Sequence, residues 1–380
     1  MIYQFKFQGD TSVIVPDKLV RLCSAKSNNR RWFAALIALC SLIAFSCNAA
    51  YADPDFAQVA GGTSPDSPAL TFFNHIPIMM VRANDSTNAI LYSINKGAWI
   101  HVPTGTTKAA PALVTWGSHV VAVHIGEDGN FYSMVMSNGS AAPSSWTFNS
   151  SWTLVQGAPG QAQTNLRPSL TVGLDNFLYL VATFTDRSIN LTNATGVDSQ
   201  GNIQWAPEFA QLPGEGVTNS SASAAFSNNV LTVFQTGADR NLYVEGFDLS
   251  NDVQSEHWTQ LPGLVAPGAL SFGTAASVID SNGDIVVCGV DRTVLRIVCA
   301  QVTVIETPSP ASTQTISFEL GAVSALNVPG VPEMMRSPTM AFDSGIAMAV
   351  AATFSNPRTA QPGVWLSAVK SFSAIVTAGQ

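Results

Sequence analysis

The sequence has few charged residues: aspartate, glutamate, lysine and arginine together make up 11% of its 380 residues. Basic residues are the scarcest. Residues 1–52 hold six of the 17 basic residues and two of the 25 acidic ones, so 11 basic and 23 acidic residues remain from residue 53 onward, a net charge of −12. Nucleic acids and anionic membrane surfaces repel so acidic a chain. We therefore expect no nucleic-acid partner, and no membrane partner once residues 1–52 are removed.

Helical periodicity is also missing. No stretch repeats apolar residues at the 3.6-residue spacing of an amphipathic helix, so we expect almost no helix. The apolar content of 46% still permits a large core, and the 28 glycines and 21 prolines suit short strands joined by tight turns. These features together predict an all-β fold.

The sequence lacks the usual signatures of a catalytic or metal site. Its five histidines are scattered without metal-ligand spacing, and neither a G-x-S-x-G motif nor a sialidase-type S-x-D-x-G-x-T-W turn occurs. The stretch DSNGD (280–284) resembles half of a calcium loop, but it has no distal glutamate and lies where a β-turn is expected. We therefore predict no cofactor and no metal. A pair of acids for glycoside hydrolysis, Asp175 or Asp186 with Glu215, remains an alternative.

Cysteine is rare outside the N-terminal region. Three of the five cysteines lie in residues 1–52, and only Cys288 and Cys299 follow. If the turn between them spans residues 290–293, Cys288 faces Leu295 rather than Cys299. Two buried free thiols are therefore favoured over a disulfide, although an oxidising compartment would permit the disulfide.

The N-terminal region reads as a secretory signal. Arg30 and Arg31 precede a mostly apolar run at 32–47, and the small-residue motif Ala50-Tyr51-Ala52 follows. The run is shorter than the roughly 20 residues that a membrane span needs. We predict cleavage after Ala52 and a secreted or periplasmic protein. An uncleaved anchor, a lipoprotein modified at Cys47 and a translation start further along the chain are the alternatives.

Tryptophan recurs at a fixed interval. Trp99, Trp152, Trp205 and Trp258 are each 53 residues apart. Their contexts are alike, as in SSWTLVQGAPG and EHWTQLPG, and ISFELGAVSALNVPG carries Phe318 in the corresponding place. A period near 50 indicates an array of structural repeats.

Each repeat has the same internal order: a short strand, an apolar strand, a turn with an acidic or amide residue, a third strand and the tryptophan strand. Four-stranded units of this length in radial series form a β-propeller. We predict one propeller domain over residues 53–380 with six blades, seven being the alternative. The blades are placed at residues 67–107, 108–164, 165–218, 219–273, 274–331 and 332–380, the last completed by 53–66.

A spare closing strand lies at the start of this domain. FAQVAGG (56–62) has a counterpart in FAQLPGEG (209–216), which closes the third unit. The last unit ends at SFSAIVTAGQ without a tryptophan strand. We therefore expect residues 56–62 to pair as the outer strand of the sixth blade, which seals the ring and covers a sheet edge.

The unit VLTVFQTGADRNLYVEGFD…HWTQLPG resembles the repeat of bacterial β-propeller lectins, and VHIGEDGNFYSM is a second recognisable copy. The resemblance covers the chain after residue 52, but it is specific in only part of it. It implies sugar binding, typically of fucosylated or O-methylated glycans, in pockets between neighbouring blades. The chain departs from the family in its uneven repeats and in having six predicted blades rather than seven.

Two repeated sets supply candidate ligand contacts. Tryptophan faces pack on sugar rings, although the strict period favours packing between blades. Arginine suits vicinal diols or carboxylates, although an Asp-Arg pair also suits a solvated turn with a local ion pair. With tyrosines in equivalent strands, the candidate residues are Arg82, Tyr92, Tyr132, Trp152, Arg187, Trp205, Arg240, Tyr243, Trp258 and Arg292.

The sequence thus predicts an exported, non-enzymatic, lectin-like protein that binds a glycan or glycoconjugate. A glycoside hydrolase or sialidase-like propeller enzyme and a platform for protein partners are the alternatives. Two close carboxyl groups in a central pocket, one with a raised pKa, would favour the enzyme. A broad exposed apolar patch would favour the platform. The oligomeric state stays open.

Overall fold

The computed structural model of the chain describes residues 2–6, 12–16, 56–137, 143–149, 151–157, 166–213, 218–227, 229–249, 253–254, 257–270, 276–279, 284–293, 296–307, 315–326, 338–343, 347–355 and 362–369. The chain divides into two compact units, Met1–Asp53 and Pro54–Gln380. In the first unit the described residues form an antiparallel hairpin of β1 (Ile2–Lys6) and β2 (Ser12–Pro16). The predicted signal segment lies outside the described residues. No helix in the described part is long and apolar enough to span a membrane.

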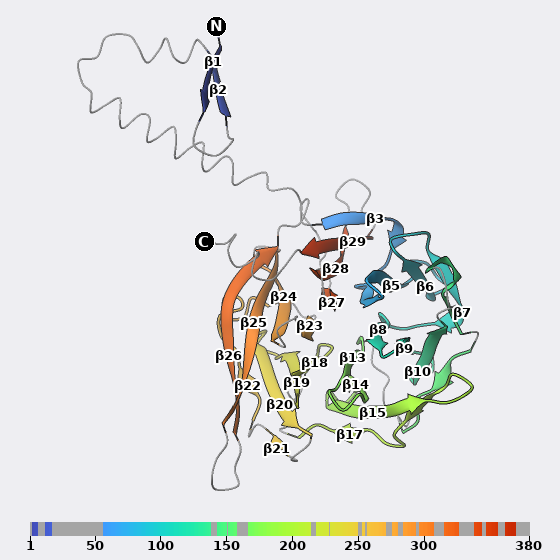
Figure 1. The fold of residues 1–380 in the computed structure, drawn as a ribbon. Coiled ribbons are helices and arrows are strands. Elements are labelled where there is room, and N and C mark those ends of the chain that lie inside the picture. The colour runs from blue at the N-terminus through green and yellow to red at the C-terminus, as the bar shows by residue number, and fades with distance from the viewer. Residues whose placement is uncertain are drawn as a thin grey trace, which may run out of the picture. The chain divides into compact units, whose positions relative to one another are not determined.

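The second unit is built from antiparallel sheets (Figure 1). Sheet 1 contains β4 (Ala69–Phe73), β5 (Ile76–Arg82), β6 (Ala89–Ile94) and β7 (Ile100–Thr106). Sheet 2 contains β8 (Ala112–Trp116), β9 (His119–Ile125), β10 (Phe131–Ser137), β11 (Thr147–Phe148) and β12 (Thr153–Leu154). Sheet 3 contains β13 (Ser169–Val172), β14 (Leu178–Thr183), β15 (Ile189–Val197), β16 (Ile203–Trp205) and β17 (Ala210–Gln211).

Three further sheets follow in the described residues. Sheet 4 contains β18 (Ser223–Ser227), β19 (Val230–Thr236), β20 (Leu242–Asp248), β21 (Val253–Gln254) and β22 (Thr259–Gln260). Sheet 5 contains β23 (Ala276–Ile279), β24 (Ile285–Asp291), β25 (Arg296–Thr307) and β26 (Thr315–Leu326). Sheet 6 contains β27 (Thr339–Asp343), β28 (Ala347–Ser355), β29 (Pro362–Val369) and β3 (Phe56–Thr63).

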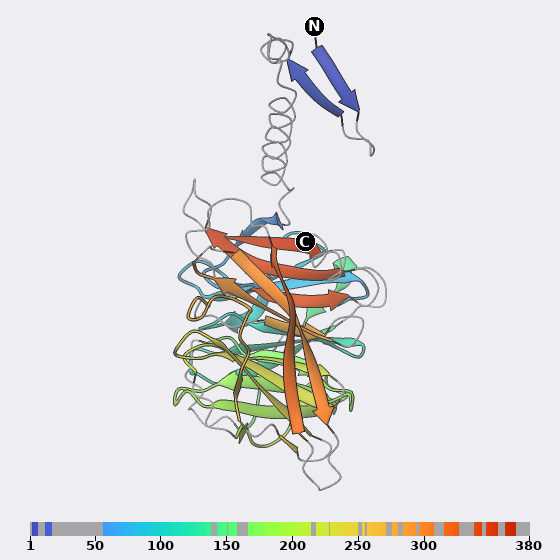
Figure 2. The same ribbon diagram turned by 90° about the vertical axis from the view of Figure 1, so that its left-hand side faces the viewer.

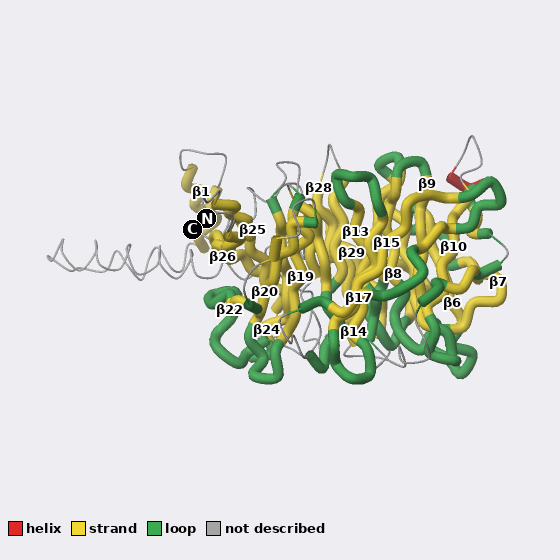
Figure 3. Tube along the Cα trace, turned by 90° about the horizontal axis from the view of Figure 1, so that it is seen from below, coloured by secondary structure: helices red, strands yellow, loops and turns green. Residues whose placement is uncertain are grey.

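Consecutive strands are neighbours within each sheet. In sheets 2, 3 and 4 the outer strand is interrupted, and its two short pieces both pair with the third strand. Trp152, Trp205 and Trp258 lie at these interruptions. A 3₁₀ turn, η1 (Pro143–Ser145), precedes β11 and is the red segment in Figure 3. The described residues hold no α-helix, as the sequence predicts.

The first strands of the six sheets contact one another in cyclic order. The order is β4, β8, β13, β18, β23, β27 and β4 again. Six hydrophobic clusters lie between consecutive sheets in the same order, including one between sheets 6 and 1. Figure 1 shows these sheets around a common axis, and Figure 3 shows the loops gathered at the two ends of the strands. The second unit is therefore all-β with a propeller-like arrangement.

Burial decreases from the second strand of a sheet toward its outer strand. Every residue of β14 and β19 is buried, whereas β17 and β22 are exposed. A strand that is covered on both faces needs apolar side chains at successive positions rather than alternate ones. This explains continuous apolar runs such as HVVAVHI in β9.

The N-terminal strand β3 pairs antiparallel with β29 as the outer strand of sheet 6, the pairing predicted for residues 56–62. Its Val59 is buried in the cluster shared with sheet 1. The carbonyl of Ala60 accepts a hydrogen bond from the Trp99 indole at 3.2 Å. The first and last described strands of this unit thus share one sheet.

Sheet 5 corrects the prediction for the cysteines. Cys288 lies directly opposite Cys299, and the two residues form a disulfide between β24 and β25. The sequence instead favoured free thiols, with Cys288 facing Leu295. Both cysteines are fully buried. Figure 2 shows β25 as one of the two long orange strands of this sheet.

The error lies in the position of the turn. Predicted at 290–293, the turn in fact follows Asp291, which pairs with Arg296. The Asp291 carboxylate accepts hydrogen bonds from the backbone N–H and the hydroxyl of Thr293, at 2.8 and 2.6 Å. This side-chain turn starts the reversal one residue later, and the longer loop brings the two cysteines into register.

Candidate functional site

Acidic turns join the second and third strands of several sheets. In sheet 4 the Asp239 carboxylate accepts hydrogen bonds from the backbone of Asn241 (3.1 Å) and from the Tyr243 hydroxyl (2.8 Å). Burial acts to raise the pKa of Asp239, but these hydrogen bonds outweigh it and lower the pKa. The same bond to Asp239 raises the pKa of Tyr243. This tyrosine is therefore held by its own turn.

Sheet 2 repeats this arrangement. The Tyr132 hydroxyl donates to Asp128 at 2.7 Å. Its ring stacks on that of His124, with centroids 5.6 Å apart. Burial lowers the pKa of His124 to about 4, so this imidazole is neutral at physiological pH. Trp152 packs edge-on against the same imidazole, with centroids 4.2 Å apart.

The predicted arginines lie on the turns of their own sheets. Arg187 and Arg240 have positive φ angles of 70° and 62°, and Arg187 and Arg292 are exposed. The backbone N–H of Arg292 donates to the Ala269 carbonyl at 2.9 Å. Arg82 differs, because its guanidinium forms an ion pair with Asp66 at 2.7 Å.

The periodic tryptophans reach from the outer strands toward the preceding sheet. The Trp205 indole donates to the hydroxyl of Ser133 in sheet 2 at 3.0 Å. Trp152 lies against Gly105 of sheet 1, where a Cβ atom would be 2.9 Å from the indole nitrogen. Trp258 packs on the cluster shared by sheets 3 and 4. These contacts pack neighbouring sheets together, the role that the strict period favoured.

Tyr92 also lies within a core cluster. It is 3% exposed and packs edge-on against Phe148, with ring centroids 5.1 Å apart. Burial raises its pKa. As a set, the sequence-predicted ligand residues are therefore spread over turns, outer strands and core rather than gathered at one place. Their roles as ligand contacts stay predictions.

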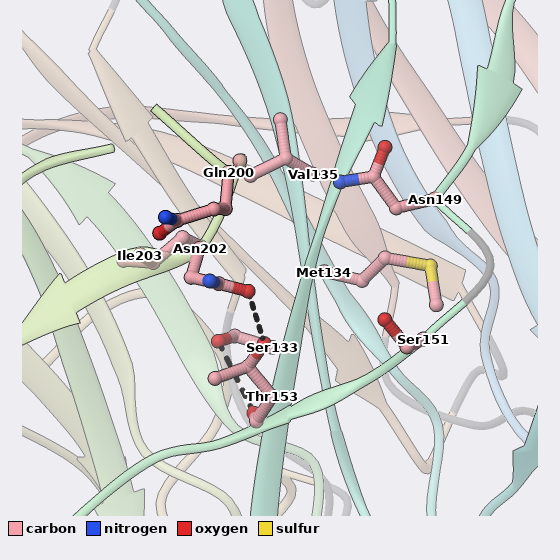
Figure 4. Close-up of a pocket in the computed structure, with 10 residues that line it drawn as sticks. Ser133, Met134, Val135, Asn149, Ser151, Thr153, Gln200, Asn202 and Ile203 are labelled. Atoms are coloured by element: carbon pink, nitrogen blue, oxygen red, sulfur yellow. Dashed lines mark hydrogen bonds between the residues drawn. The ribbon is translucent and has the colours of Figure 1, made fainter. Parts of the chain in front are cut away.

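A polar pocket of about 260 Å³ lies between sheets 2 and 3. We call it the interblade pocket, and Figure 4 shows the side chains that line it. Its walls come from β10, from the residues around β11 and β12, and from the turn between β15 and β16. The lining residues are Ser133, Met134, Val135, Asn149, Ser151, Thr153, Gln200, Gly201, Asn202 and Ile203.

The pocket exists because the outer strand of sheet 2 is interrupted. β11 pairs with the end of β10 and β12 with its start, so Met134 and Val135 have no outer strand beside them. At the interruption the backbone N–H of Asn149 donates to the Val135 carbonyl at 3.1 Å. The turn of sheet 3 faces this gap, and the Thr153 hydroxyl donates to the Asn202 side chain across it at 3.0 Å.

The pocket is polar but uncharged. Among the described residues its lining contains amides and hydroxyls, and no ionisable or aromatic side chain. Asp198 lies behind the turn and accepts hydrogen bonds from the backbone N–H groups of Gln200 (2.9 Å) and Asn202 (2.8 Å). The side-chain amides of Asn149 and Gln200 make no hydrogen bond within the described part of the chain, so they are available to a ligand.

The acids suggested for hydrolysis form no pair in the described residues. Asp175 follows β13 and is bonded to the Tyr179 hydroxyl at 2.5 Å. Asp175 therefore precedes β14, whereas Asp186 follows the opposite end of β14. The Asp186 carboxylate accepts a hydrogen bond from the Ser188 hydroxyl at 2.6 Å. Glu215 lies outside the described residues, as does the DSNGD stretch apart from its last residue. No group of three or more histidine, cysteine or acidic residues in the described part could hold a metal ion.

Sequence reasoning missed the residues of the interblade pocket. Asn202 ends the stretch VDSQGN, in which Asp198 begins a turn. The turn chemistry of this stretch was the one signal in the sequence for a residue of the pocket. The reasoning also missed Glu245, which is fully buried and whose carboxyl oxygens accept no hydrogen bond from the described residues. Burial raises the pKa of Glu245 to about 8. An isolated glutamate in a strand gives no sequence signal for this.

Comparison with known proteins finds similarity in the fold but not in the sequence. The sequence matches no family model and no curated protein. A Dyadobacter fermentans protein of unknown function has a similar structure, with a TM-score of 0.51 at 11% identity over 83% of this chain and 100% of that one. A mutant of AofleA from Arthrobotrys oligospora, in which three arginines are replaced by alanine, gives 0.49 at 13% identity, over 80% and 83%. The SapL1 lectin in complex with alpha methyl fucoside gives 0.46 at 12%, over 82% and 99%.

Proposed function

We propose that the chain is an exported six-bladed β-propeller that binds a neutral sugar, without chemical change, in the interblade pocket. The six sheets are its blades, and β3 completes the sixth. The uncharged lining of the pocket, rich in amides and hydroxyls, is the observation that carries the proposal. The resemblance of the sheet 2 and sheet 4 repeats to those of propeller lectins supports it.

The lining chemistry matches sugar hydroxyls. Each hydroxyl both donates and accepts hydrogen bonds, and a side-chain amide supplies both functions within one group. Asn149 and Gln200 offer free amides, while Asn202 is held in place by Thr153 and by Asp198, whose carboxylate accepts from its amide at 3.2 Å. Asn202 thus forms a fixed wall beside the free amides of Asn149 and Gln200. These uncharged groups favour an uncharged polyol over an ion as the ligand.

The size of the pocket limits the ligand to about one sugar ring. Its volume of about 260 Å³ lies below the roughly 300–1,000 Å³ of pockets for drug-sized ligands. No aromatic ring of the described residues lines it, so stacking adds nothing and we expect affinities of about 1 mM for a single sugar. Presentation of many copies of the sugar on a surface would strengthen the binding.

Binding is favoured over hydrolysis at this pocket. Glycoside hydrolysis needs two carboxyl groups that flank the scissile bond, and the described lining has none. The nearest acid on the turn, Asp198, is occupied by backbone and amide hydrogen bonds to Asn202.

The protein should be tested on a glycan array as residues 53–380. We expect selective signals from one class of neutral sugar, and the Gln200→Ala variant should lose about 2–10-fold in affinity because one hydrogen bond to the ligand is lost. Gln211→Ala is the matched control, since Gln211 is an exposed residue of β17 outside the pocket. A blank array, or equal binding by the two variants, would overturn the proposal.

Export rests on the N-terminal signal pattern, and the buried disulfide fits it, because disulfides persist in oxidising compartments. The N-terminus of the protein purified from its native compartment tests this. A mature chain that begins at Asp53 is the expected result, and a reduced, intracellular chain that begins at Met1 would contradict it.

A further inference from the structure

A second, smaller cavity lies where the first strands of the sheets come together. Its volume is about 60 Å³, and we call it the axial cavity. It has room for a group of a few heavy atoms, since one water needs only about 10–15 Å³ on the same measure. The lining residues are Ala69, Leu70, Pro111, Ala112, Leu113, Arg167, Pro168, Ser169, Leu170, Ser223, Thr339 and Met340.

Arg167 is the one ionisable residue among the described residues of that lining. Its guanidinium donates to the Thr339 hydroxyl, and it makes no other hydrogen bond within the described part of the chain. Burial lowers its pKa to about 10, against the attraction of Asp66. Asp66 is already in an ion pair with Arg82 at 2.7 Å. Among the described residues, Asp66 is thus the acid that attracts both the Arg167 and the Arg82 guanidinium groups.

A second unused donor lies in the same cavity. Ser223 is 4% exposed, and its buried hydroxyl has no hydrogen-bond partner among the described residues. The neighbouring Ser169 hydroxyl already accepts from the backbone N–H of Ala224 at 3.0 Å. An unpaired hydroxyl and an incompletely paired guanidinium in one small cavity are costly, because buried donors normally find acceptors.

We propose that the axial cavity binds a single carboxylate group, held by the guanidinium of Arg167 and the hydroxyl of Ser223. A carboxylate matches the planar donor pair of arginine and supplies the acceptors that both residues lack. The cavity is too small for a sugar ring, so the rest of the ligand extends out of it. A free organic acid and an acidic sugar both present this group. The site is separate from the interblade pocket and does not depend on sugar binding there.

The test is calorimetric titration of the full chain with sodium acetate, sodium D-glucuronate and D-glucose at constant ionic strength. We expect at least one carboxylate to bind and glucose to leave the site empty. Arg167→Gln should weaken carboxylate binding by about tenfold or more, because a charge-assisted hydrogen bond is lost. Tighter binding of acetate identifies the ligand as a small organic acid, and tighter binding of glucuronate identifies an acidic sugar.

Arg296→Gln is the matched control, because Arg296 is exposed, lies outside the axial cavity and is not among the candidate ligand residues. Its carboxylate affinity should equal that of the wild type, as should that of Gln200→Ala in the interblade pocket. Ser223→Ala keeps the charge and should bind a few-fold more weakly, which gives a second readout if Arg167→Gln fails to fold. The proposal is wrong if the wild type binds neither carboxylate at millimolar concentration, or if Arg296→Gln loses as much affinity as Arg167→Gln. It is equally wrong if Ser223→Ala binds as the wild type does.

Discussion

Glycine decides the geometry of the acidic turns at the scale of single residues. Gly237 precedes Asp239 by two residues, and a Cβ atom there would lie 2.7 Å from the Asp239 carboxylate and 2.6 Å from the Tyr243 ring. Gly126 has the same relation to Asp128 and Tyr132. The pattern G-x-D-x-x-x-Y therefore joins three residues in one hydrogen-bonded turn. The sequence predicts the aspartate turn, but the bond that occupies the tyrosine hydroxyl becomes visible only in the folded chain.

Gly237→Ala should destabilise the protein by about 1–3 kcal/mol, because the methyl group pushes the ring and the carboxylate apart. Urea unfolding of the variant measures this. Gly196→Ala is the control, since the nearest atom to a Cβ at Gly196 is the flexible Gln204 side chain at 3.8 Å. If the two variants have the same free energy of unfolding, the close approach at Gly237 does not affect stability and the prediction is wrong.

At the scale of elements, strand β20 holds a carboxyl group at a core position of its sheet. Glu245 faces the cluster between sheets 3 and 4, opposite Val233 of β19. The corresponding position in sheet 2, two residues after the tyrosine of the turn, is Met134. The repeat pattern alone predicts that position 245 is buried in the core. It does not predict how the burial of an acid at this position changes the pKa of the acid and the stability of the fold.

Glu245 should make stability fall as pH rises. Its pKa is raised from 4.5 to about 8 by burial, so the folded protein keeps a proton that the unfolded chain releases. Stability from this group is fully present below about pH 4.5 and is lost as the pH rises toward 8. Glu245→Gln should remove that loss in unfolding experiments between about pH 5 and 8. Glu208→Gln, at an exposed position, should keep the wild-type profile, and an unchanged profile in Glu245→Gln would contradict the assignment.

At the scale of the whole molecule, the ring of sheets creates both cavities. The interblade pocket depends on a contact between Thr153 and Asn202, 49 residues apart, and the axial cavity on one between Arg167 and Thr339, 172 residues apart. The repeat predicts strands, turns and the pairing of residues 56–62, because each follows from local pattern or from a missing partner strand. It does not predict which side chains of neighbouring sheets meet, since that depends on how the sheets pack.

In the ring, the tryptophans that pack the sheets together and the proposed sugar contacts occupy different positions. The tryptophans that recur every 53 residues lie between sheets, where they hold neighbours together. The proposed sugar contacts lie instead where the interrupted outer strand of sheet 2 faces the turn between β15 and β16 of sheet 3.

The central claim is that a neutral sugar occupies the interblade pocket. The most direct measurement is an NMR titration of residues 53–380 with L-fucose, or with the sugar that the glycan array selects, while the side-chain amide and indole resonances are followed. The side-chain amide signals of Asn149 and Gln200 should shift together with saturation at about millimolar sugar. The indole signal of Trp258, which packs between sheets 3 and 4 outside the pocket, should stay unchanged. Shifts confined to other parts of the ring, or none at all at saturating sugar, would contradict the account.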